Sequence, residues 1–291
     1  MTEDRQVNSK LQRSYDDEIR RHYDAVASAH KDSSSSTMED AIVRAKETDC
    51  IHRLIRSYMS RTQVGGGDGD RLAIVDVGCG NGYTLSKLAE SLPQHTYTGV
   101  EFTDSLRVIA RQRFAESGIT VFGGDLRDRA SLPDAQFDVL VCQRVLINLL
   151  DPADQSAALS NVVGLVKDGG LCIFIEAFQS GLNNLNNARR EFDIPEIPPA
   201  QHNRYLDDGF FDRETLRPWQ PEHDRVESNL FSTHYYVTRV FHEVLLRATS
   251  TSFIRNSHFV QFWSRALPEG IGDYSPLRVT ALLKGTTPEN K

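Results

Sequence analysis

Three glycines in five positions, Gly78, Gly80 and Gly82, are the residues of this sequence whose spacing points most directly to chemistry. They follow the apolar run 72–77 and precede the amphipathic segment 83–92, so they lie between an expected strand and an expected helix. Glycine gives up much conformational entropy in a compact fold, so such a cluster indicates a strained turn or a backbone that passes close to a ligand.

Two classes of ligand compete for this turn. A dinucleotide site needs the pattern G-x-G-x-x-G, which brings the backbone close to a pyrophosphate at a helix N-terminus. Here the third glycine comes one residue early, and Tyr83 stands where that pattern needs glycine. A loop without a phosphate to hold needs only to pass close to an aminocarboxypropyl chain. The spacing therefore favours the methionine end of S-adenosylmethionine over NAD.

Acidic residues end the next two apolar segments. Glu101 lies at the end of segment 96–102, where a carboxylate can accept hydrogen bonds from both ribose hydroxyls. Asp125 ends segment 119–125, where it could accept one from an adenine amino group. Each acid alone could equally be a helix cap or an exposed strand end. Together with the glycines they predict a nucleoside site at one edge of a sheet.

The surrounding pattern predicts the fold that brings these residues together. Near-continuous apolar strands alternate with amphipathic helices between residues 71 and 178, which is typical of a parallel sheet covered on both faces. Right-handed crossovers make such a sheet doubly wound. The expected strands are 72–78, 96–102, 119–125, 137–143, 171–178, 225–232 and 277–285. We therefore expect an α/β, mostly parallel, Rossmann-like sheet of seven strands, with a helix over 235–248.

Four regions follow from this pattern. Residues 1–62 are expected to be a helical lid across the cofactor mouth, and residues 70–178 the cofactor-binding core. Residues 179–224 are rich in Asn and Pro without a clear period, and such long segments are usually functional, so we interpret them as a substrate cap. Residues 225–291 are expected to complete the sheet.

The composition limits the classes of partner that we expect for this chain. The chain of 291 residues has a formal net charge of −7 and no strongly basic stripe, which argues against nucleic acid as a partner. Neither a membrane-spanning segment nor an export signal is expected. The four cysteines are scattered, which suits reduced thiols in the cytoplasm and argues against a metal site. A small molecule is the expected partner, and the oligomeric state stays open.

These motifs resemble those of the class I S-adenosylmethionine-dependent methyltransferases. "VDVGCGNG" is similar to the family's first motif, "GVEF" to its ribose-binding strand, "GGDL" to its adenine-binding loop, and "FDVLVCQRVLINL" to its fourth strand. The resemblance covers residues 70–178 and implies S-adenosylmethionine as the cofactor. The residues it places at the cofactor, together with Arg44 from the N-terminal helices, are Asp76, Gly78, Cys79, Gly80, Asn81, Gly82, Glu101, Phe102, Asp125, Leu126 and Gln143.

The resemblance does not supply a catalytic base, because "VLINLLD" replaces the family's "VLxHL". A hydroxyl nucleophile gains from a general base, whereas an amine needs only to be deprotonated beforehand. His202, in the stiff and polar stretch "PPAQHNRYLDD", is the first candidate, since imidazole titrates near neutral pH. Glu176, at the end of the fifth strand, is the alternative base or a substrate clamp. An exposed histidine and a carboxylate paired with an arginine are the plainer readings of these two residues.

The acceptor is expected to be polar, because the cap is rich in amide, histidine and arginine side chains rather than apolar ones. We therefore expect methyl transfer to a hydroxyl of a sugar or another biosynthetic metabolite. N-methylation, or a protein that binds S-adenosylmethionine without transferring its methyl group, are the alternatives, and an NAD-dependent oxidoreductase is disfavoured. The residues predicted to meet the acceptor are Tyr23, Asn203, Arg204, Tyr205, His234 and Tyr235.

Overall fold

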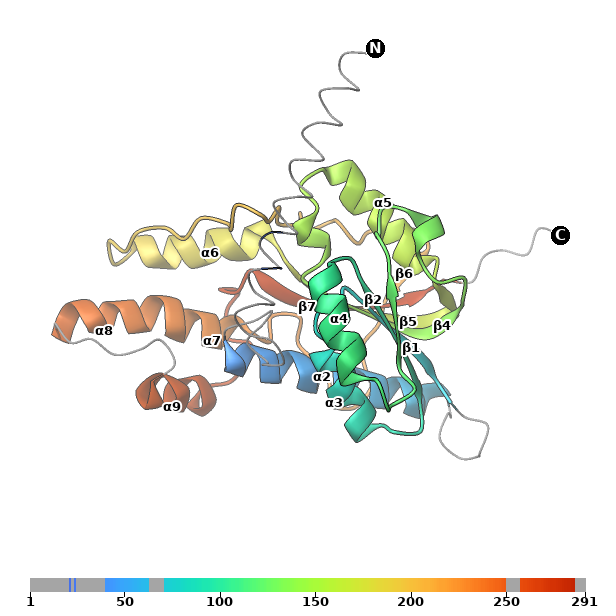
Figure 1. Cartoon of the computed structure of the whole chain (residues 1–291). Coiled ribbons are helices and arrows are strands. Elements are labelled where there is room, and N and C mark those ends of the chain that lie inside the picture. Colours follow the sequence, from blue (N-terminus) through green and yellow to red (C-terminus); the bar gives the residue numbers. More distant parts are fainter. Residues whose placement is uncertain (1–20, 22–23, 25–39, 63–70, 250–256, 286–291) are drawn as a thin grey trace, which may run out of the picture.

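The computed structural model describes residues 21, 24, 40–62, 71–249 and 257–285. Seven strands form one sheet in the order β3-β2-β1-β4-β5-β7-β6 (Figure 1). The sheet confirms the predicted α/β fold, with strand order reversing next to β1. Ligands bind at such a reversal, beyond the carboxyl ends of the strands.

The first five strands are parallel. They are β1 (Ala73–Val77), β2 (Thr96–Glu101), β3 (Thr120–Gly123), β4 (Phe137–Gln143) and β5 (Val166–Ala177). β1, β4 and the second half of β5 are mainly apolar and buried, which suits strands that are covered on both faces, whereas the edge strand β3 buries only Val121. In the register, Asp76 lies beside Gly99 of β2 and Val141 of β4, so its side chain is enclosed by both neighbours.

The last two strands are antiparallel additions. β7 (Leu277–Lys284) pairs with β5, and the short β6 (Leu216–Pro218) pairs with the outer edge of β7. The prediction of a strand over 225–232 was wrong. The side chains of Asn229 and Ser232 in that stretch bind the backbone carbonyls of Gly270 and Ile271, which holds it in a turn that leads into a helix. The sixth strand therefore comes from the region predicted to be the cap.

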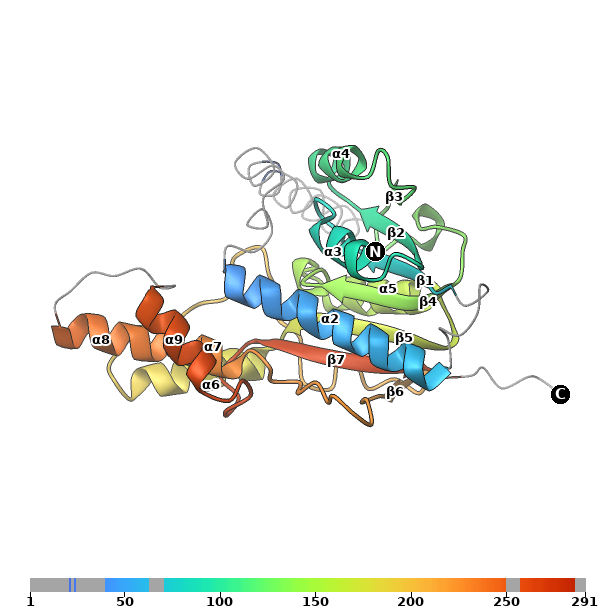
Figure 2. The same cartoon turned by 90° about the horizontal axis from the view of Figure 1, so that it is seen from below.

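Helices cover both faces of the sheet. α2 (Ala41–Thr62) and α3 (Tyr83–Ser91) lie on one face, and α5 (Pro152–Val163) lies on the other (Figures 1 and 2). α4 (Asp104–Arg113) packs against β2 and β3. α2 buries Ile51, Leu54 and Ile55 against the core, so this part of the predicted lid is a core helix. Residues of the predicted lid before position 40, apart from 21 and 24, lie outside the described residues.

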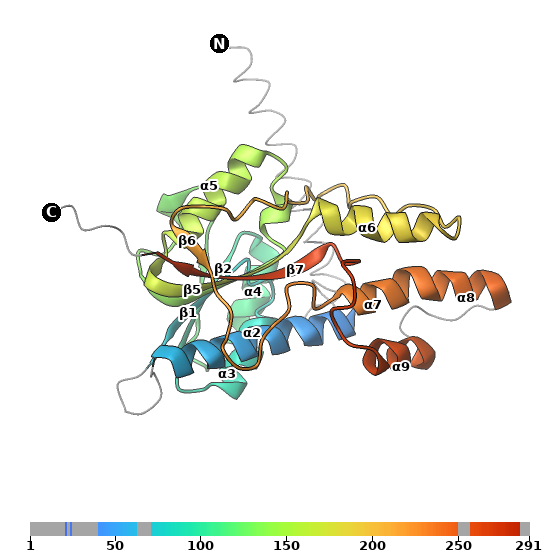
Figure 3. The same cartoon turned by 180° about the vertical axis from the view of Figure 1, so that it is seen from behind.

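A helical arm projects beyond the sheet (Figure 3). It consists of α6 (Gln179–Arg190), α7 (Ser232–Tyr236), the π-helix η4 (Val237–Phe241), α8 (His242–Thr249) and α9 (His258–Ala266). α7 to α8 confirm the helix expected over 235–248. α6 was not predicted, because its buried Leu182, Leu185 and Ala188 are separated by asparagines that hide the apolar stripe. No helix within the described ranges is long and apolar enough to cross a membrane.

Candidate active site

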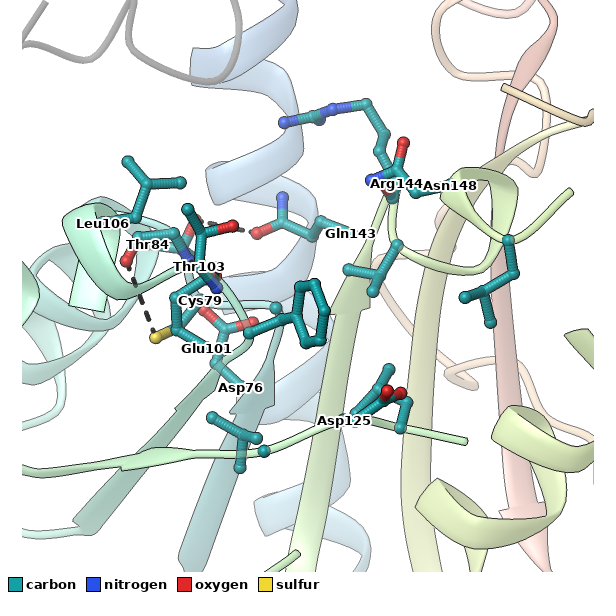
Figure 4. Close-up of a pocket in the computed structure, with 18 of the residues that line it drawn as sticks. Asp76, Cys79, Thr84, Glu101, Thr103, Leu106, Asp125, Gln143, Arg144 and Asn148 are labelled. Atoms are coloured by element: carbon teal, nitrogen blue, oxygen red, sulfur yellow. Dashed lines mark hydrogen bonds between the residues drawn. The ribbon is translucent and has the colours of Figure 1, made fainter. Parts of the chain in front are cut away.

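A cavity opens at the carboxyl ends of β1 to β4, beside α2 (Figure 4). Ten of the twelve residues predicted to bind the cofactor line it, and Asn81 and Gly82 do not. The ten are Arg44, Asp76, Gly78, Cys79, Gly80, Glu101, Phe102, Asp125, Leu126 and Gln143. Four successive strand ends therefore meet at one cavity, as the motif order predicted.

Two of the three motif glycines, Gly78 and Gly82, leave room for neighbouring side chains. All three have positive φ angles, a region that non-glycine residues seldom adopt. A Cβ atom on Gly78 would lie 2.2 Å from Cγ2 of Val145, so this glycine lets the loop after β4 approach. A Cβ atom on Gly82 would lie 2.5 Å from the ring of Phe114, so this glycine serves packing of α3 rather than the cavity. Asn81 turns inward and accepts a hydrogen bond from the Tyr83 backbone, 3.2 Å away.

Glu101 connects the glycine loop to the end of β2. Its two oxygens accept hydrogen bonds from the backbone N–H groups of Gly80, at 2.8 Å, and Thr103, at 2.7 Å. Burial raises the pKa of this carboxyl, and the two backbone donors oppose the rise. The Thr103 side chain also hydrogen-bonds to this carboxylate, which leaves one lone pair that a ribose hydroxyl could use.

Asp125 lines the cavity after β3, but its carboxylate is already engaged. It accepts hydrogen bonds from the backbone N–H of Arg127, at 2.9 Å, and from the guanidinium of the same residue, at 2.6 Å in the closest contact. The predicted contact with the adenine amino group would be an additional hydrogen bond to this carboxylate, and it stays a prediction.

Asp76 is the least satisfied group in the cavity. Its side chain is 1% exposed, and neither carboxylate oxygen has a hydrogen-bond partner among the described residues. Burial raises its pKa to about 7, opposed by the charge of Arg44 and reinforced by that of Glu101. Buried polar atoms in proteins are nearly always hydrogen-bonded, so this carboxylate indicates a missing donor.

Two more polar atoms of the cavity lack partners within the described part of the chain. They are Nε2 of Gln143, whose Oε1 accepts a hydrogen bond from Thr84 at 2.8 Å, and Nε of Arg44. Together with Asp76 they offer one anionic acceptor, one neutral donor and one cationic donor. An α-amino acid carries the complementary ammonium and carboxylate. These residues therefore fit the methionine end of S-adenosylmethionine.

The structure corrects the predicted role of Glu176 as a base or substrate clamp. The side chain is 0% exposed and does not line the cavity. Its oxygens accept hydrogen bonds from the backbone N–H groups of Val145 (2.9 Å), Leu146 (3.1 Å) and Ile147 (3.3 Å). Glu176 thus holds the turn after β4, and none of its oxygens is presented to a substrate.

His234 is also structural. Its Nε2 lies 2.9 Å from Oδ2 of Asp40, at the start of α2, and its Nδ1 lies 3.0 Å from Oγ of Ser264 in α9. All three side chains are buried. The predicted acceptor contact at His234 is therefore wrong, because Nε2 joins the helical arm to the start of α2 and Nδ1 bonds within the arm.

The other predicted acceptor residues do not line the cavity, and Tyr23 lies outside the described residues. Tyr235 is buried, with the Arg239 guanidinium 3.8 Å from its ring centroid. Arg204 is exposed, and its backbone N–H donates to the carbonyl of Ile147 at 2.7 Å. The segment with His202, Asn203 and Tyr205 therefore passes beside the turn that contributes Asn148 and Leu149 to the cavity.

Several cavity residues were missed by sequence reasoning. Arg144 follows β4 with a positive φ of 54°, and it pairs with the buried Glu47 of α2. Thr84, Thr103 and Arg127 also line the cavity. Each of these four residues lies one or two positions after a predicted residue, so extending each motif by two residues would have found them, whereas Leu106, Asn148 and Leu149 lie further along the chain.

Comparison with known proteins agrees with this geometry. Residues 74–170 match a family model described as a methyltransferase domain. An uncharacterized methyltransferase from Mycobacterium bovis is 32% identical over 111 residues, which are 38% of this chain and 53% of that protein. A ubiquinone biosynthesis O-methyltransferase from Stutzerimonas stutzeri is 31% identical over 103 residues, 35% of this chain and 42% of that protein. The chain thus matches about half the length of these relatives.

The whole chain also has a structural counterpart. Magnesium protoporphyrin IX methyltransferase from Synechocystis, solved with bound S-adenosylhomocysteine, superimposes with a TM-score of 0.50 over 96% of this chain and 100% of that chain. At 13% identity this similarity concerns the fold alone. The family model matches the segment that runs from β1 through β4, and the cavity lies at the carboxyl ends of these strands, where the strand order reverses beside β1. Residues 74–170 of this chain therefore match a methyltransferase domain.

Proposed function

We propose that this protein transfers the methyl group of S-adenosylmethionine to a hydroxyl of a small polar molecule, a sugar or another biosynthetic metabolite. The observation that carries the proposal is the unpartnered carboxylate of Asp76 at the carboxyl end of β1, with Gln143 and Arg44 beside it. The O-methyltransferase among the relatives supports a hydroxyl as the acceptor. We also propose that the protein acts in the cytoplasm without nucleic acid, given its four buried free cysteines and its net charge of −7.

Positioning is the main contribution of the chain to this reaction. The sulfonium of the cofactor supplies an activated methyl group and a good leaving group. The protein must then hold the nucleophile in line and close to that methyl group. Asp76 and Arg44 would bind the amino-acid end, Glu101 the ribose and Asp125 the adenine. Phe102, Leu106 and Leu126 line the same cavity with apolar surface.

His202 remains our candidate for the general base. Glu176 is enclosed by backbone donors, whereas the segment that contains His202 lies beside the same turn, held there by the hydrogen bond from the Arg204 N–H to the Ile147 carbonyl. If His202 takes the acceptor's proton, His202→Ala should lower turnover about 10²–10⁴-fold with unchanged cofactor affinity. An unaltered rate and pH profile would instead favour an amine acceptor, hence N-methylation.

The proposed function is tested first by cofactor binding. S-adenosylmethionine and S-adenosylhomocysteine should raise the melting temperature, because a ligand that binds only the native state stabilises it, and NAD should not. Acceptors are then screened with methyl-labelled cofactor. Binding without transfer to any hydroxyl or amine would support the alternative of a non-methylating S-adenosylmethionine-binding protein, and absence of binding would contradict the proposal.

A further inference from the structure

Glu47 is a buried carboxylate that neither the sequence motifs nor the proposed mechanism uses. It lies on α2 on the face that also buries Val43, Cys50 and Leu54, and its side chain is 0% exposed. An ionised carboxylate is costly to bury unless charged partners and hydrogen bonds compensate it. Its position among apolar core residues therefore needs a reason beyond the stability of α2.

Two arginines of the cavity are its partners. Oε1 of Glu47 accepts a hydrogen bond from the guanidinium of Arg144, and Oε2 lies 3.7 Å from Nη1 of Arg44. Arg44 comes from one turn earlier on α2, whereas Arg144 follows β4, and both line the cavity. Figure 4 shows the Arg144 side chain extending from the end of β4 toward α2. One carboxylate thus connects two walls of the cavity.

The backbone at Arg144 is adapted to this contact. Its φ of 54° lies in the left-handed region, which is costly for a non-glycine residue and is usually found where the surroundings impose it. The Arg144 N–H donates to the carbonyl of Ile175 at 2.8 Å, so the turn is fixed from β5 as well. The conformation aims the side chain over the cavity, where Glu47 receives it.

The negative charge of Glu47 offsets the repulsion between Arg44 and Arg144. Arg44 and Arg144 are close enough for each charge to affect the other, and without a carboxylate between them they would repel. With Glu47 between them, both guanidinium groups stay together, and both are close enough to Asp76 for their charges to act on its carboxyl. Side chains that are fixed before binding lose less entropy when a ligand arrives.

We propose that Glu47 is a positioning residue, which holds Arg44 and Arg144 at the methionine end of the cavity and thereby sets the affinity for S-adenosylmethionine. The inference rests on the proposed function, because it assigns the amino-acid end of that cofactor to these arginines. Glu47 itself is separated from the ligand by its two partners and acts through them.

The test is calorimetric titration of the full chain with S-adenosylhomocysteine, which needs no acceptor. Glu47→Gln should weaken binding about 10-fold or more, because Gln keeps the shape but loses the charge that holds both arginines. Glu269→Gln is the matched control, since Glu269 pairs with Lys46, the neighbour of Glu47 on α2, and lies outside the cavity. It should bind S-adenosylhomocysteine like the wild type.

A double-mutant cycle separates positioning from general stability. Arg144→Gln should also weaken binding about 10-fold, and Arg144→Lys should fall between it and the wild type. If Glu47 acts through Arg144, the loss in the double variant is clearly smaller than the sum of the single losses, at comparable melting temperatures. A merely structural Glu47 would lower the melting temperature without such coupling in the binding free energy.

The outcomes are distinct. Wild-type affinity in a folded Glu47→Gln variant, or fully additive losses in the cycle, overturns the positioning role while leaving the proposed function intact. If Glu47→Gln does not fold, the Arg144 variants decide: unchanged affinity in Arg144→Gln overturns the inference, and a loss that Arg144→Lys partly restores supports it. A wild-type protein that does not bind S-adenosylhomocysteine overturns the proposed function, and this inference with it.

Discussion

Two buried carboxylates, at the carboxyl ends of β1 and β5, have the same burial and opposite surroundings. Asp76 is 1% exposed and Glu176 is 0% exposed, and burial raises the pKa of each to about 7. Glu176 accepts hydrogen bonds from three consecutive backbone N–H groups, whereas Asp76 accepts none from any described residue. The first arrangement is complete as it stands, and the second requires a ligand.

The comparison separates a structural acid from the acid that we propose to bind the cofactor, which a shifted pKa does not. Perturbed pKa values are often used to find functional residues, although buried structural networks perturb them too. Here burial raises both pKa values to about 7, and the hydrogen-bond partners and the position at the cavity distinguish the two acids. Four predictions test that distinction.

The largest effect is expected at Glu176. Glu176→Ala leaves the N–H groups of Val145, Leu146 and Ile147 without their acceptor and opens a cavity under the turn. Each stranded buried donor costs about 1–3 kcal/mol, so we expect a loss of roughly 3–5 kcal/mol in the free energy of unfolding, measured with urea. Glu176→Gln, which keeps one acceptor oxygen, should fall between. A stable Ala variant with weakened cofactor binding would show instead that Glu176 faces the ligand.

Asp76 should respond in the opposite way. Asp76→Asn removes a carboxylate whose ionisation is opposed by burial, so the ligand-free protein should gain about 2–4 kcal/mol of stability at pH 8. The same change removes the acceptor for the ligand's ammonium, so affinity for S-adenosylhomocysteine should fall at least about 10-fold. Chemical unfolding and calorimetry on one preparation measure both. A variant that loses stability would place Asp76 with Glu176 as a structural acid.

The stability of the wild-type protein should change with pH as Asp76 and Glu176 ionise. Because each folded-state pKa is raised to about 7, the folded protein binds more protons than the unfolded chain between about pH 4 and 7. Their contribution to stability is therefore complete below about pH 4 and is lost as the pH rises through 7. Affinity for S-adenosylhomocysteine should rise over the upper part of this range, as Asp76 ionises beside the ligand's ammonium.

Asp76→Asn provides the control for that profile. It should remove the rise in affinity with pH but keep the part of the stability change that belongs to Glu176. If the rise in affinity persists in the variant, another group of the cavity is responsible, and Glu101, whose pKa is also raised by burial, is the next to test.

The sequence could predict the ligand-binding half of the molecule because its signals are local. Gly78, Gly80 and the acids at strand ends each stand directly after an apolar run, so topology alone brings them together. The fate of Glu176 was not predictable in this way, because it depends on three N–H groups from a turn some thirty residues earlier. Glu47 was hidden for a similar reason: a charged residue in a helical stripe shows its partners only in three dimensions.

The helical arm was the harder half. The asparagines of α6 mask its apolar positions, so the segment reads as irregular although Leu182 and Leu185 are buried. His234 looked available for an acceptor, since its partners Asp40 and Ser264 come from distant parts of the chain. Long-range pairing of polar side chains therefore decided the role of His234, whereas the local spacing of apolar residues hid α6.

Asp40 adds a third buried carboxylate to the comparison and should give the smallest effect. Burial alone would raise its pKa, but the hydrogen bond and charge of His234, with the backbone N–H of Val43, outweigh burial and lower it to about 2. Because the pKa of Asp40 is lowered, its effect on stability has the opposite pH dependence to that of Asp76 and Glu176. Its contribution to the free energy of unfolding is present above about pH 4 and is lost as the pH falls toward 2. We expect about 1–2 kcal/mol from this pair, measured as acid-induced unfolding between pH 4 and 2.

Asp40→Asn keeps an oxygen to cap α2 and should lose only this acid-sensitive part, with unchanged affinity for S-adenosylhomocysteine because neither Asp40 nor His234 lines the cavity. A fall in cofactor affinity in this variant would mean that the junction between α2 and the arm, and not Asp76 alone, sets the geometry of the binding edge.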